Sequence, residues 1–147
     1  MPANGSSNGG AGVRAAAVSL GGAAVGVSKA ALAIAVRYGN ERRQFTGADE
    51  HREVTLLDYQ RHQRRLLPLL ARTYAAGFAQ QGLLEHFDDV FSGAHDDDDS
   101  RQDLETLAAA LKPPTTWLAM ETLQEAREAC GGAGYMAENR LVTWRQD

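Results

Sequence analysis

Two separated motifs in this 147-residue chain have the residue types needed to hold an anionic nucleotide. The first, Tyr38–Phe45, ends a predicted helix with two adjacent arginines, whose guanidinium groups can pair with a diphosphate. The second, Ala126–Tyr135, breaks a predicted helix at Gly131, Gly132 and Gly134. Only glycine lets a phosphate or a flat ring come so close to the backbone. Together the motifs predict a site for a dinucleotide-type cofactor.

Each motif also has an ordinary structural explanation. A glycine directly after a helix is a common C-cap that needs no ligand, and Gly131 stands at such a position. Arg42 and Arg43 near a helix C-terminus can complement the helix dipole, an effect of about 0.3 to 1 kcal/mol. The glycines do not follow a strand and open a helix, which excludes the βαβ dinucleotide fingerprint. The cofactor prediction therefore depends on the two motifs acting together.

Other chemistry has little support in the sequence. It contains no Gly-x-Ser-x-Gly elbow, no His-Glu-x-x-His and no Cys and His pattern with ligand spacing, which disfavours hydrolases and metalloenzymes. We interpret His51, His62 and His86 as polar residues of a surface or helix face. Glu138 is a conceivable base, but nothing in the sequence fixes its pKa. Asp96–Asp99 lacks the spacing of a calcium loop and predicts a solvated surface loop, so no metal site is expected.

Composition narrows the class of protein. A net charge of −4 and a pI near 5.5 argue against a nucleic-acid partner. Cys130 is the single cysteine, so no internal disulfide forms, and we expect a small buried residue in a reducing compartment. The length fits one domain but is short for an enzyme that holds both a large cofactor and a substrate.

The first residues and the hydropathy pattern add two expectations. Met1–Gly12 is rich in Gly, Ser, Asn and Ala and has no charged start, which predicts a disordered segment rather than a secretory signal. No uninterrupted apolar run approaches the ~20 residues of a membrane helix, so we expect a soluble chain without membrane insertion.

Hydrophobic periodicity predicts three long helices and no strand of importance. The first runs from about Val13 to Arg43, and a loop, Gln44–Thr55, separates it from the second, which starts near Leu56. The third runs from Ser100–Asp103 to Ala129, after a loop over Phe87–Asp103. The predicted inward stripes are Leu20, Ala24, Val27, Ala31, Ile34 and Tyr38 in the first helix, and Leu56, Tyr59, Gln63, Leu66, Leu67, Leu70, Tyr74 and Phe78 in the second.

Prolines interrupt two of these helices. Pro68 predicts a kink in the second helix rather than its end. Pro113 and Pro114 predict a bend or a brief break at Lys112 in the third, because the residue before a proline avoids the α region. The expected fold is all-α, an antiparallel helical bundle with three long helices.

Several segments of the chain together resemble one known family. They are Lys29–Tyr38, Glu41–Phe45, Leu56–Gln60, Leu67–Leu70 and Ala129–Tyr135. In this order they are similar to acyl-CoA oxidases of the acyl-CoA dehydrogenase superfamily, and the similarity runs from about Val18 to Asp147. Met1 to Ala17 does not share it.

The resemblance implies a flavoenzyme that oxidises a fatty acyl-CoA to trans-2-enoyl-CoA in β-oxidation and forms hydrogen peroxide. It implies FAD as cofactor and a homodimer in which Arg42 meets an FAD diphosphate held mainly by the other subunit. Phe45 would lie beside the cofactor, and Gln60 would add a polar contact. The turn with Gly131, Gly132 and Gly134 would lie along the same cofactor. The implied location is peroxisomal in a eukaryote or cytoplasmic in a bacterium.

The sequence also departs from the family pattern. The family's catalytic base is a glutamate in a Phe-Glu-Gly type motif shortly beyond the Tyr135–Arg140 region, and this sequence has no such motif. Ala17 replaces a usual arginine, and the helical domain and β-domain that cover the flavin are absent. We therefore expect a disordered segment over 1–12, a truncated C-terminal-like domain over 13–147, no catalytic residue and no activity of the chain alone. The alternatives are a non-catalytic helical dimerisation or assembly module and a cofactor-free four-helix regulator.

Overall fold

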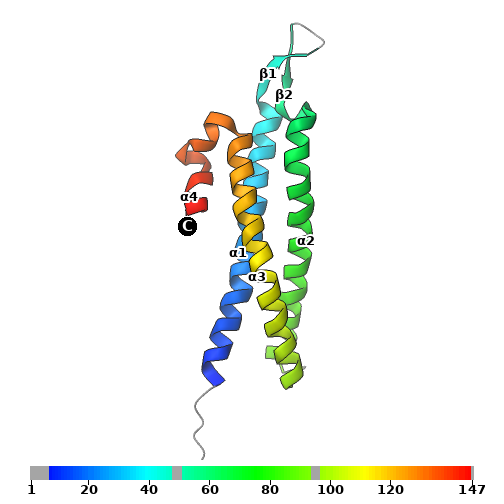
Figure 1. Cartoon of the computed structure of the whole chain (residues 1–147), viewed down its shortest axis with the longest axis vertical. Helices are drawn as coiled ribbons and strands as arrows, with labels where there is room; N and C mark the ends of the chain where they lie inside the picture. Colours follow the sequence, from blue (N-terminus) through cyan, green and yellow to red (C-terminus); the bar gives the residue numbers. More distant parts are fainter. Residues whose placement is uncertain (1–6, 48–50, 94–96, 147) are drawn as a thin grey trace, which may run out of the picture. The chain divides into compact units, whose positions relative to one another are not determined.

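Three long helices make up most of the computed structural model, which describes residues 7–47, 51–93 and 97–146, with side chains from residue 16 onward (Figure 1). The long helices are α1 (Ser7–Glu41), α2 (Gln60–Phe91) and α3 (Asp98–Ala129), and α4 (Leu141–Gln146) is short. Strands β1 (Arg43–Thr46) and β2 (Glu53–Thr55) follow α1, and single 3-10 turns cover Leu56–Asp58, Gly131–Tyr135 and Ala137–Asn139. This confirms the predicted all-α bundle with three long helices.

The chain forms two compact units, and each long helix contributes to both. Unit 1 contains the residues up to Val25 together with Ala75–Trp117. Unit 2 contains Gly26–Tyr74 together with Leu118–Asp147. Both predicted cofactor motifs belong to unit 2, so the site can be described within that unit alone.

Unit 1 has an apolar core to which all three helices contribute. Its buried members are Val18, Leu83, Val90, Leu104 and Ala108. Beside this core the buried Gln80 donates from Nε2 to the carbonyl oxygen of Val18 at 2.8 Å. A Cβ added at Gly21 would lie 2.5 Å from Gln80 Oε1, so the glycine allows α1 to pass close to α2 here.

Unit 2 contains the end of α1, the start of α2 and the end of α3. A Cβ added at Gly39 would lie 3.1 Å from Leu57 and His62, so α1 ends next to the start of α2. Between α2 and α3, Arg65 pairs with residues at the end of α3, whereas Arg72 pairs with Glu121, earlier in α3. Because the later residue of α2 pairs with the earlier residue of α3, the two helices are antiparallel, as predicted.

The inward faces of α1 and α2 differ from the predicted stripes. In α1 the exposed Leu20 was wrongly placed inside, although Ala24 and Ala31 are buried as predicted. In α2 the predicted Leu67, Tyr74 and Phe78 are 56, 60 and 73% exposed. The buried faces of these helices include small and polar side chains, which a count of large apolar residues overlooks. The buried positions are Val18, Gly21, Ala24, Val25, Ser28, Ala31, Leu32, Ala35 and Gly39 among the residues of α1 whose side chains are described, and Leu66, Leu69, Thr73, Gln80, Leu83 and Val90 in α2.

A small antiparallel hairpin replaces most of the predicted loop Gln44–Thr55. Arg43 pairs with Thr55 and Thr46 with Glu53, with an irregularity between these pairs. The strands have four and three residues, too short for the alternation of side chains to be visible in the sequence. The structure thus corrects the expectation that no strand matters, because this hairpin positions the end of the first motif.

The ends of the long helices also differ from the prediction. α1 begins at Ser7, earlier than the predicted start near Val13, and Met1–Ser6 lies outside the described residues. The disordered segment over 1–12 stays a prediction. The loop before α3 is shorter than expected. The helix α2 continues to Phe91, and the first turn of α3 already contains Asp98 and Asp99. Acidic side chains there complement the helix dipole, which explains why an aspartate run opens a helix.

Neither proline site ends its helix. α2 continues through Pro68, and α3 continues through Pro113 and Pro114 without the predicted break at Lys112. After the prolines, the hydroxyl groups of Thr115 and Thr116 donate to the carbonyl oxygens of Leu111 and Lys112, at 2.8 and 2.9 Å. These bonds do not replace those lost at the prolines, because the carbonyl oxygens without a proline N–H partner are those of Ala109 and Ala110.

Length and composition alone would allow α1 to cross a membrane. The stretch Ala16–Glu41 has a mean hydropathy of 1.6, although Ser and Gly interrupt it. The core helix of a bundle has the same composition, and α1 buries a continuous face that includes Ser28, Leu32 and Ala35. The absence of membrane insertion therefore stays a prediction.

Candidate functional site

Arg42 follows the last residue of α1 and joins the helix to the hairpin. Its backbone N–H donates to the carbonyl of Tyr38 at 2.8 Å, and its own carbonyl accepts from Leu56 N–H at 2.9 Å. The backbone of Arg42 is therefore fixed on both sides, while its side chain is exposed. This geometry leaves the guanidinium accessible to an external anion, and it is equally compatible with a role at the helix C-terminus.

Phe45 presents its ring to solvent from a strained backbone. Its φ is 60°, in the left-handed region that a bulky side chain rarely adopts, and the residue is 70% exposed. The neighbouring strand backbone is tied down, because Tyr59 donates its hydroxyl to the carbonyl of Gln44 at 2.6 Å. A strained residue that exposes an aromatic ring suggests a contact with a flat ligand or a partner.

Gln60 stands next to this anchor as the first residue of α2. Its side chain is exposed, as expected of a polar contact to a ligand. Arg42, Phe45 and Gln60 thus lie on three adjoining segments of unit 2, connected by the backbone bond to Leu56 and the Tyr59 bond.

The three glycines of the second motif have different structural roles. Gly131 has a φ of +55° directly after α3, which is the left-handed C-cap that favours glycine. Gly134 is buried, and a Cβ there would lie 2.0 Å from the carbonyl oxygen of Arg127. At Gly132 an added Cβ would meet no atom of the described chain within 4 Å. Only Gly132 has no internal reason to be glycine, so it is the position best explained by a close external contact.

The turn is held in place by contacts around these glycines. Asn139 Nδ2 donates to the carbonyl of Ala133 at 2.5 Å. The Arg127 guanidinium carbon lies 4.5 Å from the ring centre of Tyr135, a cation–π contact. Cys130 is fully buried, as predicted, and burial raises the pKa of its thiol. The turn therefore presents a fixed backbone.

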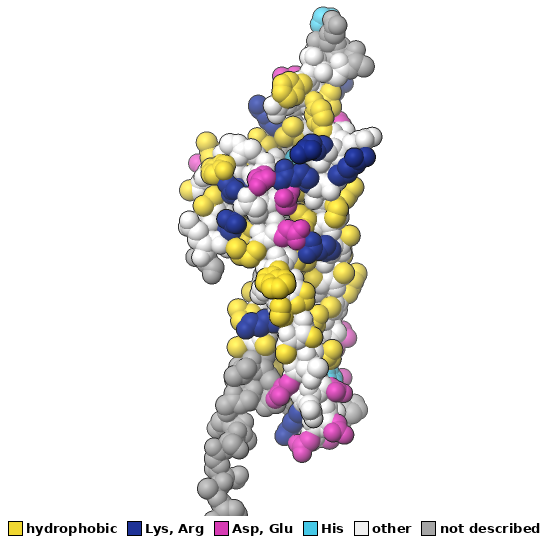
Figure 2. Space-filling model, in the orientation of Figure 1, with side chains coloured by type: hydrophobic (Ala, Val, Ile, Leu, Met, Phe, Trp, Pro, Cys, Tyr) yellow, Lys and Arg dark blue, Asp and Glu magenta, His cyan; other side chains and the backbone are white. Residues whose placement is uncertain are grey.

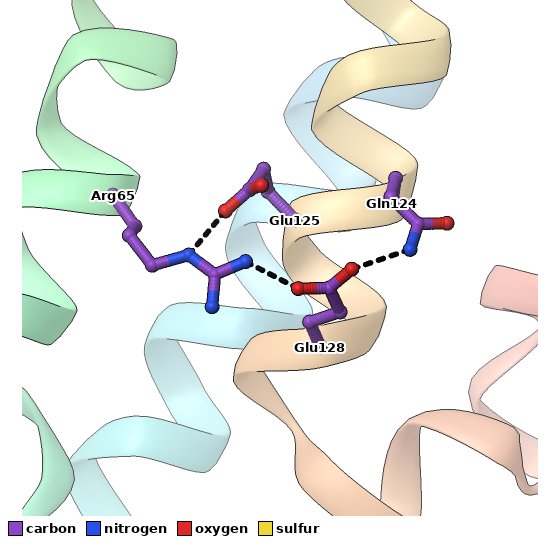
Figure 3. Close-up of polar contacts among 4 residues, drawn as sticks. All are labelled: Arg65, Gln124, Glu125 and Glu128. Carbon is purple, nitrogen blue, oxygen red and sulfur yellow. Dashed lines mark hydrogen bonds and ion pairs between the residues drawn. The ribbon is translucent and has the colours of Figure 1, made fainter.

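A charged cluster connects α2 to the end of α3 (Figure 3). Arg65 donates from Nε to Glu125 and from Nη2 to Glu128, both at 2.5 Å. Gln124 donates to the second oxygen of Glu128. The hydrogen bonds from Arg65, and then from Gln124, lower the pKa of Glu128, and those to Glu125 and Glu128 raise the pKa of Arg65. This cluster joins the helix that follows the first motif to the helix that precedes the second.

A hollow of about 240 Å³ opens beside Phe45, at the start of α2. Figure 2 shows Lys and Arg side chains gathered near the hairpin end, with Asp and Glu side chains beside them. The sequence analysis missed this hollow, although two arginines four residues apart on one helix face were a readable signal. Its lining residues are Gln44, Phe45, Leu56, Tyr59, Arg61, His62 and Arg65.

The two motifs approach the same end of unit 2 from different helices. α1 ends beside the start of α2, and Arg65, in the second turn of α2, reaches Glu128 in the last turn of α3. The hollow is lined by the end of the first motif, by Leu56 and Tyr59 before α2 and by the start of α2, and its lining includes none of the three glycines. Glu138, the conceivable base, is exposed in a 3-10 turn.

A comparison with the models of known protein families shows to which family the chain belongs. The model of the acyl-CoA oxidase C-alpha1 domain matches residues 12–147, nearly the whole chain. The chain belongs to the acyl-CoA oxidase family. The resemblance inferred from the sequence motifs is thus confirmed.

Curated acyl-CoA oxidases show the same relationship over a limited part of their length. The chain is 42% identical over 130 residues to the peroxisomal acyl-coenzyme A oxidase 2 of Arabidopsis thaliana, covering 88% of this chain and 18% of that protein. It is 42% identical over 125 residues to the human peroxisomal acyl-coenzyme A oxidase 3, covering 81% and 18%. The chain therefore spans less than a fifth of the length of these relatives.

Solved acyl-CoA oxidases contain the same helical arrangement. An acyl-CoA oxidase from tomato aligns with a TM-score of 0.77 and 32% identity, over 87% of this chain and 20% of that one. The acyl-CoA oxidase-1 of Caenorhabditis elegans, complexed with FAD and ATP, aligns with a TM-score of 0.72 and 35% identity, over 83% and 19%. The all-α fold of this acyl-CoA oxidase segment is confirmed by these neighbours.

Proposed function

We propose that this chain is a helical part of an FAD-dependent acyl-CoA oxidase that converts a fatty acyl-CoA and oxygen to trans-2-enoyl-CoA and hydrogen peroxide. The match to the C-alpha1 domain over residues 12–147 is the observation that supports this most strongly. The predicted domain, residues 13–147, follows nearly the same limits and remains part of the proposal. Since the named relatives in plants and humans are peroxisomal, a eukaryotic protein of this kind belongs in the peroxisome.

In this proposal the chain contributes to holding the cofactor rather than to bond breaking. Arg42 pairs with the diphosphate, Phe45 packs its ring against the cofactor, and Gln60 adds a hydrogen bond. The backbone at Gly131, Gly132 and Gly134 passes along the same molecule, with Gly132 in closest contact. Bound FAD would supply the two-electron redox chemistry of the reaction.

The described residues fit such a cofactor in two respects. Phe45 keeps a strained backbone and an exposed ring, which the chain alone does not explain. Gly132 is open and has no internal need to be glycine. A flat, anionic molecule held largely by a partner subunit would account for both features, and a homodimer is therefore part of the proposal.

The reaction also needs a base for the α-proton, and the sequence lacks the Phe-Glu-Gly motif of the family base. We therefore expect that the purified 147-residue chain does not turn over. Peroxide formation from palmitoyl-CoA with added FAD would refute this expectation. A heat-denatured sample of the chain and a sample with FAD alone give the background rate.

The second candidate is an assembly module that has the dimer-forming surface and no chemistry. It is favoured by the apolar outer face of α2 in unit 2, where Leu67, Leu70 and Tyr74 are exposed. Absorbance in the flavin bands and size-exclusion chromatography separate the two candidates. A flavin spectrum that co-elutes with the protein supports the cofactor role, whereas self-association of a colourless protein supports the assembly module.

A further inference from the structure

A cavity of about 420 Å³ lies between α1 and α2, and all the residues that line it belong to unit 2. Its volume is in the range of cavities that bind small molecules. Each helix contributes three residues at the spacing i, i+3 and i+4, which places them on one face of that helix. The lining residues of this α1–α2 cavity are Lys29, Leu32 and Ala33 from α1 and Leu70, Thr73 and Tyr74 from α2.

Buried residues form the floor of the α1–α2 cavity, and exposed residues form its rim. Leu32 and Thr73 are only 3% and 2% exposed. Lys29, Leu70 and Tyr74 are exposed. The leucine side chains and the tyrosine ring make the walls largely apolar, so a ligand with an apolar body gains free energy when it displaces water from them.

The Thr73 hydroxyl is a buried polar group without a use in the fold. Its Oγ1 has no hydrogen-bond partner among the residues that the structure describes. The hydroxyls of Thr106 and Thr115, by contrast, donate to carbonyl oxygens one turn earlier in α3. Thr122 is unpaired like Thr73, but it does not line the cavity. Because a buried unpaired hydroxyl is costly, a ligand that brings a polar atom to the floor satisfies this group without breaking an existing bond.

Lys29 supplies a positive charge at the rim. Its side chain is exposed and forms no ion pair with any residue that the structure describes. The lining contains no acidic side chain, so an anionic group at the mouth is attracted rather than repelled. The flexible stem of a lysine lets its ammonium group reach a carboxylate in several positions. A carboxylate at the rim and a neutral polar atom at the floor therefore match the two ends of the cavity.

We propose that the α1–α2 cavity binds a small hydroxylated aromatic carboxylate, whose hydroxyl pairs with Thr73 and whose carboxylate meets Lys29. Its ring packs among Leu32, Leu70 and Tyr74. A ring suits these walls because it can stack on the tyrosine, and because it holds the two polar groups apart at a low entropy cost. The cavity shares no residue with the proposed FAD contacts, so this inference goes beyond the proposed function and does not depend on it.

The test titrates the full ¹⁵N-labelled chain with p-hydroxyphenylpropionate. The amides of Leu32 and Thr73 should shift, and those of Phe45 and Gly132 should not. Two related compounds are titrated in parallel. Phenylpropionate lacks the hydroxyl and should bind about tenfold more weakly, as expected for the loss of one hydrogen bond to a buried partner. The amide p-hydroxyphenylpropionamide lacks the charge and should bind about threefold more weakly, because solvent screens an ion pair at an exposed lysine.

Substitutions assign each difference to one residue. Thr73→Val nearly keeps the shape of the side chain and removes its hydroxyl, so this variant should bind phenylpropionate and p-hydroxyphenylpropionate equally. Its melting temperature should not fall, because no hydrogen bond within the fold is lost. Lys29→Gln should abolish the preference for the acid over the amide. The matched control, Arg37→Gln, should keep this preference, because Arg37 is also exposed on α1 and does not line the cavity.

The absence of shifts at Leu32 and Thr73 would overturn the inference, and so would three other results. Equal binding of the two acids by the parent chain would mean that Thr73 makes no contact. Octanoate that binds as tightly as p-hydroxyphenylpropionate would mean a site for apolar chains in general. Self-association that abolishes binding would mean that a second copy fills the cavity. None of these results bears on the FAD contacts, which are tested by titration with FAD.

Discussion

Gly134 lies so close to Arg127 that a Cβ added to the glycine would be 2.0 Å from the arginine carbonyl oxygen. The last turn of α3 and the glycine turn are therefore packed backbone to backbone. Gly132, two residues earlier, has open space instead. One motif thus contains a glycine required for folding and a glycine available for a ligand.

This difference predicts opposite results for two alanine substitutions. Gly134→Ala should lower the free energy of unfolding by about 2 kcal/mol or more, because rigid backbone must move to admit the methyl group. Gly132→Ala should leave stability within about 0.5 kcal/mol of the parent chain. Urea denaturation followed by circular dichroism measures both. Equal destabilisation by the two substitutions would contradict the assignment of roles.

The Arg65 cluster predicts a modest, salt-dependent contribution to stability. Arg65 is 38% exposed, so solvent screens its pairs with Glu125 and Glu128. Arg65→Met should cost about 1 kcal/mol in low salt and less in 1 M NaCl. Arg64→Met is the control and should cost close to nothing. A loss that does not change with salt would show that packing rather than charge holds α2 to α3.

Asp97 predicts how stability changes in acid. Its carboxylate accepts from the backbone N–H and the hydroxyl of Ser100, at 2.8 and 2.9 Å, and these bonds lower its pKa. A lowered folded-state pKa stabilises the fold above the ordinary pKa, and this stabilisation is lost as the pH falls through the lowered value. Asp97→Ala should reduce the melting temperature at pH 7 and flatten its fall below pH 4. A melting temperature that falls in acid as steeply in the variant as in the parent chain would contradict this role of Asp97.

Cys130 predicts protection from thiol reagents. The side chain is fully buried and burial raises the pKa of its thiol, so little thiolate forms and access is blocked. Reaction with Ellman's reagent should be slow in buffer and fast in 6 M urea. Fast reaction of the native protein would mean that the end of α3 opens readily.

The sequence predicted the elements better than it predicted their faces. Three long helices follow from periodicity, but Leu20, Tyr74 and Phe78 are exposed while Gly21, Ser28 and Thr73 are buried. Closely packed helices bury small side chains at their contacts, and a pattern of hydrophobic residues does not identify these positions. The same limitation hid the hairpin, whose strands are too short to show alternation.

The site residues were predicted by type, whereas their separate roles needed coordinates. Spacing suggested all three glycines equally, and only the distance to Arg127 separates Gly134 from Gly132. The left-handed backbone of Phe45 has no signature in the sequence, because φ there depends on the hairpin that follows.

The central claim is that the two motifs contact one cofactor, and a titration of the ¹⁵N-labelled chain with FAD tests it most directly. The amides of Phe45 and Gly132 should shift together and give the same dissociation constant, and Arg42→Gln should weaken both responses equally. Shifts at one residue without the other, or two different dissociation constants, would contradict a shared ligand.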